Sequence, residues 1–143
     1  MAMLNIENLT TLTINNKLLK EIYISLTTKD IDITICDNST IKKYNSKFRN
    51  IDMATDVLSF PISGEFENMP LGSIVISADK VRKRAKELNH SISSELALLF
   101  IHGTLHLLGY DHEIDSGEMR EKERELIERF NLPDSLIVRT ERE

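Results

Sequence analysis

The chain has 143 residues, of which 41% are hydrophobic and 29% charged, and its formal net charge is −5. That balance is globular, and it excludes a low-hydropathy disordered chain and a collagen-like repeat. No apolar run reaches the ~18 to 20 residues that cross a bilayer, and the N-terminus lacks the basic-then-apolar pattern of a secretion signal. We therefore expect a soluble, cytoplasmic protein with one domain over residues 1–143. Its single cysteine, Cys36, leaves no internal disulfide.

The first third of the chain is predicted to alternate between strand and helix. After Asp30, isoleucines alternate with Asp and Thr, the period of two that is typical of a strand with one buried face. A spacing of about 3.6 residues between apolar side chains predicts the neighbouring helices. The expected elements are a strand at Leu4–Thr10, a helix at Ile14–Leu26, a strand at Asp30–Cys36 and a helix at Thr40–Phe48.

Two further strands follow, and a proline limits where the first of them can lie. The first is predicted at Val57–Ile62, where Pro61 lacks the N–H that a central strand would donate. We therefore expect this strand to lie at a sheet edge or to end at the proline. Ser63–Pro70, with its glycine and proline, is predicted to connect it to the last strand, Leu71–Ser77.

The second half of the chain is predicted to be helical. The helices are expected at Ala78–Leu88, Ser93–Leu108 and Ser116–Phe130. The middle one is apolar nearly all round, so it should pass through the core against the sheet. Asp115 and Glu118 form a predicted capping pair for the last helix, whose apolar stripe comprises Met119, Glu123, Leu126, Ile127 and Phe130. These elements predict an α+β fold, with a small mixed sheet of about four strands packed against about five helices.

The charge is distributed unevenly along the chain. Residues 41–86 contain nine Lys and Arg residues against five Asp and Glu, whereas residues 111–143 contain six against eleven. A partner that carries phosphates would meet the basic middle segment. The alternative is that these charges simply form solvated faces.

Three of the four histidines lie within eleven residues and predict a metal site. His102 and His106 are four apart on a predicted helix, so both imidazoles lie on one face and can reach one ion. Gly109 then ends the helix, because glycine takes the positive φ that such a turn commonly needs, and His112 can return to the same point. Three imidazoles with a fourth position free for water are typical of a catalytic zinc ion.

Other polar residues near this cluster have more than one interpretation. We interpret His90, near a helix end, as a surface residue or one that interacts with the helix dipole rather than as a ligand. Asp111 either accepts a hydrogen bond from a ligand imidazole or shapes the turn. Thr55 and Asp56 are expected to turn the chain into a strand rather than to act in catalysis.

The spacing H-x-x-x-H-x-x-G-x-x-H is also that of the metzincin proteases. In those enzymes the residue after the first histidine is a glutamate that acts as general base, and here that residue is Gly103. A peptidase mechanism has therefore lost its proton acceptor, although the zincin-like metal site is retained.

Three segments of the chain resemble the YbeY family of bacterial endoribonucleases and rRNA maturation factors. Residues 102–112 read H-G-T-L-H-L-L-G-Y-D-H, which looks like the signature of that family. Residues 45–61 are similar to its segment N-x-x-x-R-x-x-D-x-x-T-D-V-L-S-F-P. The third segment, residues 71–76, departs from the family at Ser73, where an acidic residue is common.

The resemblance implies a zinc-dependent endoribonuclease specific for single-stranded RNA. It further implies a role in 16S rRNA 3′-end maturation and ribosome quality control, with the small ribosomal subunit and assembly proteins as partners and no membrane. One Zn²⁺ would be held by His102, His106 and His112. Arg49 is then a candidate catalytic residue, because its planar guanidinium could hold phosphate oxygens. Its alternative is a salt bridge to Asp52 or Asp56.

Two other functions remain open at this stage. The first is a metalloprotease or small-molecule hydrolase, against which the missing glutamate counts. The second is a non-catalytic ribosome-assembly factor whose zinc is structural. The general base of an RNA-cleaving reaction also stays open between metal hydroxide, Asp111 and the RNA 2′-hydroxyl.

Overall fold

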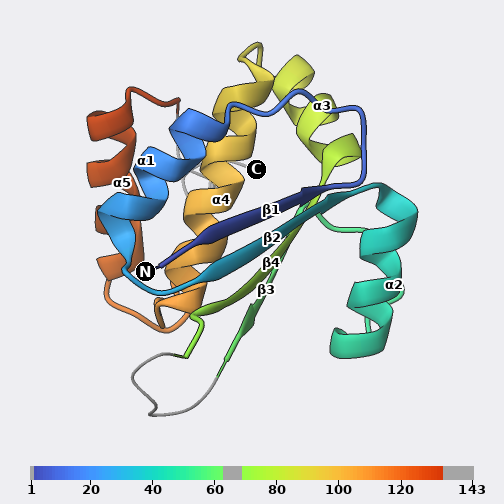
Figure 1. Cartoon of the computed structure of the whole chain (residues 1–143), viewed down its shortest axis with the longest axis horizontal. Helices are drawn as coiled ribbons and strands as arrows, with labels where there is room; N and C mark the ends of the chain where they lie inside the picture. Colours follow the sequence, from blue (N-terminus) through green and yellow to red (C-terminus); the bar gives the residue numbers. More distant parts are fainter. Residues whose placement is uncertain (1, 63–68, 134–143) are drawn as a thin grey trace.

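The computed structural model describes residues 2–62 and 69–133, and it confirms the predicted α+β class. Within these ranges the chain forms a four-stranded mixed sheet and five α-helices (Figure 1). None of these helices is long and apolar enough to cross a membrane. The elements are β1 (Leu4–Asn8), α1 (Asn16–Leu26), β2 (Ile31–Cys36), α2 (Asn38–Arg49), β3 (Val57–Pro61), β4 (Gly72–Ser77), α3 (Ala78–Glu87), α4 (Ile92–Leu107) and α5 (Glu118–Phe130).

The sheet has the strand order β1-β2-β4-β3, which places β3 at an edge. β1, β2 and β4 are parallel, while β3 runs antiparallel to β4 with Val57 opposite Ile76 and Pro61 opposite Gly72. The edge position predicted from Pro61 is therefore correct, because β3 pairs on one side only. Of the connection predicted at Ser63–Pro70, residues 63–68 lie outside the described ranges.

Helices cover the two faces of the sheet unequally. Figure 1 shows α1, α4 and α5 on one face and α2 alone on the other. The larger core joins the isoleucines of β2 and β4 to α1, α3, α4 and α5. On the α2 face a smaller cluster consists of Cys36, Ile41, Leu58 and Val75.

Helix α4 runs through the middle of the protein, as its all-round apolar sequence predicts. It begins at the N-cap Ser91, whose side chain accepts a hydrogen bond from the backbone N–H of Ser94. Twelve of its sixteen residues are buried, including Phe100, which is fully inaccessible. The helix packs against β3 and β4, and Ser59 of β3 donates a hydrogen bond to the carbonyl of Gly103, so this part of α4 lies beside the sheet edge.

The predicted elements are all present, with small differences at their ends. The first strand is shorter than Leu4–Thr10, because Asn8 accepts hydrogen bonds from Thr10 and turns the chain there. At the start of α5, Asp115 accepts from the N–H of Met119 and Glu118 accepts from that of Ser116. The predicted cap at Asp115 is therefore wrong, because the N-cap is Gly117, which makes no side-chain capping hydrogen bond, although both acidic side chains accept from backbone N–H groups nearby.

Candidate metal centre

The C-terminal end of α4 brings two histidines to the surface of the core. His102 and His106 lie one turn apart on the helix, and the chain then reverses at Gly109, whose φ of 98° only glycine adopts readily. The N–H groups of Gly109 and Tyr110 donate to the carbonyls of His106 and Leu105, the pattern of a Schellman turn. This turn carries the chain back toward the helix, as the glycine predicts.

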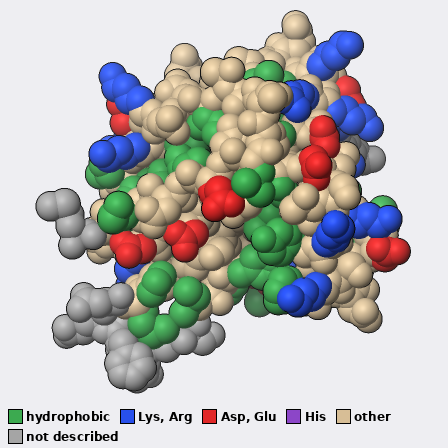
Figure 2. Space-filling view, turned by 45° about the vertical axis from the view of Figure 1, so that its right-hand side comes forward, with side chains coloured by type: hydrophobic (Ala, Val, Ile, Leu, Met, Phe, Trp, Pro, Cys, Tyr) green, Lys and Arg blue, Asp and Glu red, His purple; other side chains and the backbone are tan. Residues whose placement is uncertain are grey.

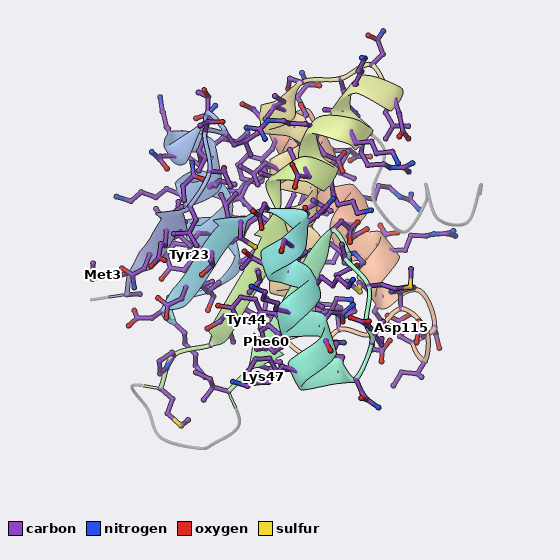
Figure 3. The ribbon with its side chains drawn as sticks, turned by 90° about the vertical axis from the view of Figure 1, so that its right-hand side faces the viewer. Met3, Tyr23, Tyr44, Lys47, Phe60 and Asp115 are labelled. Carbon is purple, nitrogen blue, oxygen red and sulfur yellow. The ribbon has the colours of Figure 1, made fainter. Side chains whose placement is uncertain are left out.

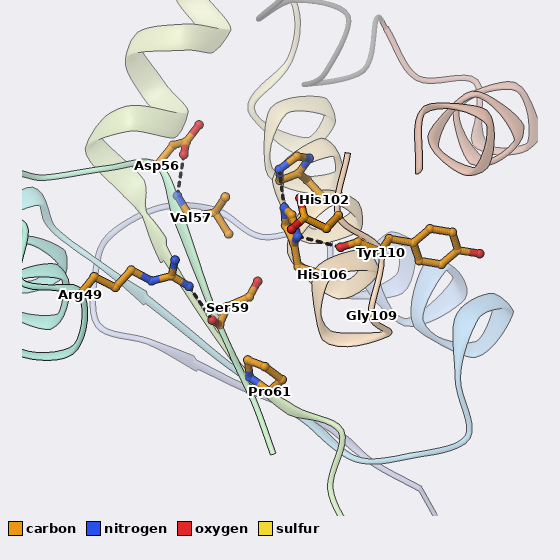
Figure 4. Close-up of a pocket in the computed structure, with 10 residues that line it drawn as sticks. Arg49, Asp56, Val57, Ser59, Pro61, His102, His106, Gly109 and Tyr110 are labelled. Atoms are coloured by element: carbon orange, nitrogen blue, oxygen red, sulfur yellow. Dashed lines mark hydrogen bonds between the residues drawn. The ribbon is translucent and has the colours of Figure 1, made fainter. Parts of the chain in front are cut away.

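The turn brings all three histidines of the motif together. One ring nitrogen from each of His102, His106 and His112 lies within 4.8 Å of the other two. The Nε2 atoms of His102 and His106 are only 3.1 Å apart (Figure 4). Zinc binds imidazole nitrogens at ~2.0–2.1 Å, which separates tetrahedral ligands by about 3.3 Å. The spacing of the first pair therefore suits one ion.

Hydrogen bonds on the far sides of two rings determine their tautomers. His106 Nδ1 lies 3.0 Å from the carbonyl oxygen of Tyr110, which can only accept, so this nitrogen carries the proton. His102 Nδ1 lies 2.9 Å from Glu123 Oε2, a buried carboxylate on α5. With a proton on each Nδ1, both Nε2 lone pairs face each other and can bind one cation, whereas a proton on His102 Nε2 makes the 3.1 Å contact a hydrogen bond to His106.

Two further observations fit a cation at this point. Within the described parts of the chain, His112 Nδ1 is buried and has no hydrogen-bond partner. Burial lowers the pKa of His106, and the neighbouring His102 and His112 lower it further, against smaller opposing effects of the Tyr110 carbonyl and Asp111. His106 is therefore neutral at neutral pH, which is the state that binds a metal.

Arg49 faces the histidines across a pocket of about 430 Å³. The pocket is lined by the face of β3 that carries Val57, Ser59 and Pro61, by the helix end with His102 and His106, and by the following turn. Figure 4 shows Arg49 entering from the α2 side, with its Nη2 donating to the carbonyl oxygen of Ser59 at 2.9 Å.

The predicted alternative for Arg49, a salt bridge to Asp52 or Asp56, does not form. Asp52 lies 3.9 Å from Lys42 instead. Asp56 Oδ1 accepts from the N–H of Val57, and the Asp56 carbonyl accepts from Ser77, so Asp56 turns the chain into β3 as expected. The guanidinium has no carboxylate partner among the described residues, which leaves its charge available to an anion in the pocket.

Gly103 lies at a close contact between α4 and the sheet. A Cβ atom at this position would lie 3.1 Å from Ser59 Oγ and 3.2 Å from methyl groups of Val57 and Ile74. Ser59 Oγ in turn donates to the Gly103 carbonyl at 2.9 Å. A side chain at this position would therefore press on Val57, Ser59 and Ile74, so a glutamate would need these neighbours to move.

The structure decides between the interpretations of Asp111 and corrects that of His90. Asp111 Oδ1 accepts from the N–H of Glu113, so its described contact is that of a turn-forming residue at the pocket rim. His90 follows α3 but is not a surface residue, because its Nε2 pairs with the fully buried Glu95 at 2.8 Å. Sequence proximity to a helix end did not reveal this buried partner.

The sequence analysis missed the role of Glu123. This residue lies on the apolar stripe of α5, between Met119 and Leu126, and it is 2% exposed. An acidic residue on an otherwise apolar stripe indicates a buried partner. Only the structure identifies that partner as His102, which lies 21 positions away in the sequence.

Comparisons with known proteins agree with this geometry. A family model described as Endoribonuclease YbeY matches residues 3–131. A protein named Endoribonuclease YbeY from Nautilia profundicola is 55% identical over 139 residues, covering 97% of this chain and 99% of that protein. One of the same name from Aliarcobacter butzleri is 56% identical over 138 residues, covering 96% and 99%.

A solved structure is similar as well. The solution structure of a Thermotoga maritima protein superposes with a TM-score of 0.62 at 32% identity, covering 90% of this chain and 89% of that one. The fold that surrounds the histidines is therefore one already seen in an experimental structure.

Proposed function

Because this chain belongs to the endoribonuclease YbeY family, we propose that it cleaves single-stranded RNA with one zinc ion held by His102, His106 and His112. The observation that carries the metal part of the proposal is the convergence of the three histidines, with the Nε2 atoms of His102 and His106 3.1 Å apart and both Nδ1 atoms already engaged. Three neutral imidazoles leave room in the coordination shell for water, the arrangement of a catalytic rather than a structural zinc site.

The bound ion would supply a water of lowered pKa and would polarise a phosphoryl oxygen. The protein keeps the imidazoles neutral and oriented toward the pocket. Glu123 and the Tyr110 carbonyl each hold an Nδ1 proton, so the Nε2 atoms of His102 and His106 stay directed at the pocket.

Arg49 is proposed to hold the phosphate that is cut. Its Nη2 is fixed on the Ser59 carbonyl, and the rest of the guanidinium lines the pocket opposite the histidines. A guanidinium preorganised in this way stabilises the negative charge that develops on the phosphoryl oxygens. The catalytic role proposed for Arg49 thus follows from its position, with one nitrogen bound to β3 and the rest of the guanidinium facing the pocket in which the RNA would lie.

A peptidase activity is not supported by the same site. Peptide hydrolysis in the proteases with this histidine spacing needs a glutamate after the first histidine. Gly103 packs against Val57, Ser59 and Ile74 instead, so this position supplies no carboxylate to act as the base.

The natural substrate is proposed to be the 3′ region of 16S rRNA within the small ribosomal subunit. Its protein partners are proposed to be the assembly proteins bound to that subunit. The support is the family together with the charge pattern: α2 carries Lys42, Lys43, Lys47 and Arg49 and no acidic residue. Such a substrate places the protein in the cytoplasm.

The test is cleavage by purified protein of a single-stranded RNA, a duplex of the same sequence and an unstructured peptide. We expect cleavage of the single strand only, lost on dialysis against a chelator and restored by stoichiometric zinc. Cleavage that survives complete metal removal would refute the metal-dependent mechanism. Hydrolysis of the peptide at a rate similar to that of the RNA would instead favour the protease alternative.

A further inference from the structure

A cluster of three aromatic rings lies on the face of the sheet opposite the histidines. Tyr44 and Phe48 of α2 are stacked with centroids 6.1 Å apart, and Phe48 meets Phe60 of β3 edge-on at 5.4 Å. Tyr44 and Phe60 complete the triangle at 6.4 Å. Figure 3 shows Tyr44 and Phe60 side by side at α2, with Lys47 next to them. We refer to Tyr44, Phe48 and Phe60 as the aromatic cluster.

The aromatic cluster is open to solvent. Phe48 is 55% exposed, and two neighbours in the following loop, Ile51 and Met53, are 48% and 65% exposed. Tyr44 and Phe60 are partly buried and pack against the small core on the α2 face of the sheet. The exposed Phe48 ring therefore packs on two rings that the core holds in place. Figure 2 shows hydrophobic groups exposed beside Lys and Arg groups toward the lower right of that view, the side on which α2 lies.

Two basic side chains lie close to the rings of the cluster, and the exposed Asp52 between Ile51 and Met53 lies 3.9 Å from Lys42. Lys47 Nζ lies 5.2 Å from the centre of the Phe48 ring, and Arg49 Cζ lies 6.0 Å from that of Phe60. Ser73, opposite Phe60 on β4, is neutral, and the carboxylate that follows it in the register, Asp32 of β2, accepts a hydrogen bond from Asn5. Exposed rings with interleaved basic side chains are typical of surfaces that bind single-stranded nucleic acid.

The cluster is continuous with the metal pocket across the free edge of β3. Successive β3 side chains alternate between the two faces: Ser59 and Pro61 line the pocket, whereas Phe60 belongs to the cluster. Arg49 spans the edge, with its guanidinium on the Ser59 carbonyl and close to the Phe60 ring. A strand whose phosphate reaches Arg49 therefore has an adjacent nucleotide beside the aromatic rings.

We propose that the aromatic cluster, with Phe48 as its exposed ring, stacks a base of the single-stranded RNA next to the phosphate that is cut. This inference rests on the proposed function and extends it, because it explains how a strand with unpaired bases is selected. A duplex keeps its bases stacked on each other and cannot offer one to Phe48. Charge complementarity favours RNA over an apolar protein segment as the occupant.

The experiment compares two short phosphorothioate oligonucleotides, which resist hydrolysis, in equilibrium binding to the zinc-loaded full-length protein. One is a single-stranded RNA, and the other has the same backbone but no bases. The variants are Phe48→Ala, Phe48→Trp and Lys47→Gln. The matched control is Ile24→Ala, which removes an apolar side chain that is 64% exposed on α1, on the opposite face of the sheet.

We expect the wild type and Ile24→Ala to bind the RNA at least about fivefold more tightly than the abasic strand. Phe48→Ala should lose most of this preference with unchanged affinity for the abasic strand, and Phe48→Trp should retain it. Lys47→Gln should weaken both strands and reduce the salt slope by about 0.7, since it removes one phosphate contact.

Two results would overturn the inference in distinguishable ways. If the protein cleaves RNA but Phe48→Ala keeps the full preference for bases, the cluster does not stack a base and serves another partner, such as a protein. If the wild type neither binds nor cleaves the RNA, the proposed function fails and the inference fails with it.

Discussion

The chemistry of His102 depends on a residue that contacts no substrate. Its Nδ1 is 2.9 Å from Glu123 Oε2, and the other carboxylate oxygen, Oε1, is buried without a partner among the described residues. A buried carboxylate in this position holds the imidazole proton on Nδ1 and raises the basicity of Nε2. Glu123 is therefore a positioning residue for the proposed metal site.

This role predicts that Glu123→Gln weakens zinc binding by about 10- to 100-fold, because the amide lacks the charge that supports the ligand. Competition against a chromophoric chelator measures the affinity. Glu95→Gln is the matched control, since it alters a second buried carboxylate, which pairs with His90 and lies about two turns before His102 on α4. Equal affinities for both variants would mean that Glu123 is only structural.

Arg49 carries the prediction about substrate. Arg49→Ala should keep stoichiometric zinc yet cleave single-stranded RNA about a hundredfold or more slowly, because a preorganised donor to the reacting phosphate is lost. Single-turnover cleavage rates and metal content are measured together. Lys17→Ala, which removes an exposed cation of α1 on the opposite face of the sheet, should cleave normally. Unchanged rates for Arg49→Ala would remove Arg49 from the site.

At this scale the sequence predicted local spacing well and distant partners poorly. His102, His106 and His112 lie within eleven residues, so helix periodicity and one glycine sufficed to bring them together. Their role as metal ligands stays a prediction. Glu123 approaches His102 from another helix, 21 positions away, and that contact depends on tertiary packing that no local pattern encodes. His90 and Glu95 are only five positions apart, and what the sequence did not show is the burial of Glu95.

The contact between α4 and β3 is the element that keeps the pocket in place. Gly103 permits the close approach, and Ser59 fastens it by donating to the Gly103 carbonyl. A glycine in a helix interior lowers helix stability by about 1 kcal/mol relative to alanine. At position 103 the close packing of α4 on the sheet offsets this cost.

We therefore predict that Gly103→Val destabilises the protein by about 1–3 kcal/mol or more, because its branched side chain overpacks Val57 and Ile74. Urea denaturation gives the free energy of unfolding. Glu125→Val, which places the same residue at an exposed position of α5, should cost far less. A loss no larger than in that control would show that α4 can move away from the sheet without penalty.

The elements themselves could be read from the sequence, but their arrangement only in part. Alternation in β2 and the all-round apolar α4 predicted where each segment lies relative to the core, and Pro61 predicted an edge. The insertion of β4 between β2 and β3 could not be predicted, because strand order depends on which edges meet after the helices have packed.

The whole molecule is acidic, yet its proposed RNA surface is basic and small. A small basic surface predicts that the RNA binding constant falls only moderately as the salt concentration rises. The expected slope of the logarithm of the binding constant against the logarithm of the salt concentration is about −1.5 to −3, for two to four phosphate contacts. Titration with sodium chloride in a binding assay with phosphorothioate RNA gives the slope. A value near zero would mean that phosphate contacts contribute nothing, and the basic α2 would then be an ordinary solvated face.

The central claim is that three imidazoles hold one catalytic metal ion, and metal analysis of His106→Ala tests it most directly. We predict about one zinc per chain in the wild type and in His90→Ala, and almost none in His106→Ala after dialysis, since two imidazoles hold the ion weakly. RNA cleavage should disappear with the metal. If His106→Ala keeps a full equivalent of zinc, the ion is bound elsewhere and the account of the site is wrong.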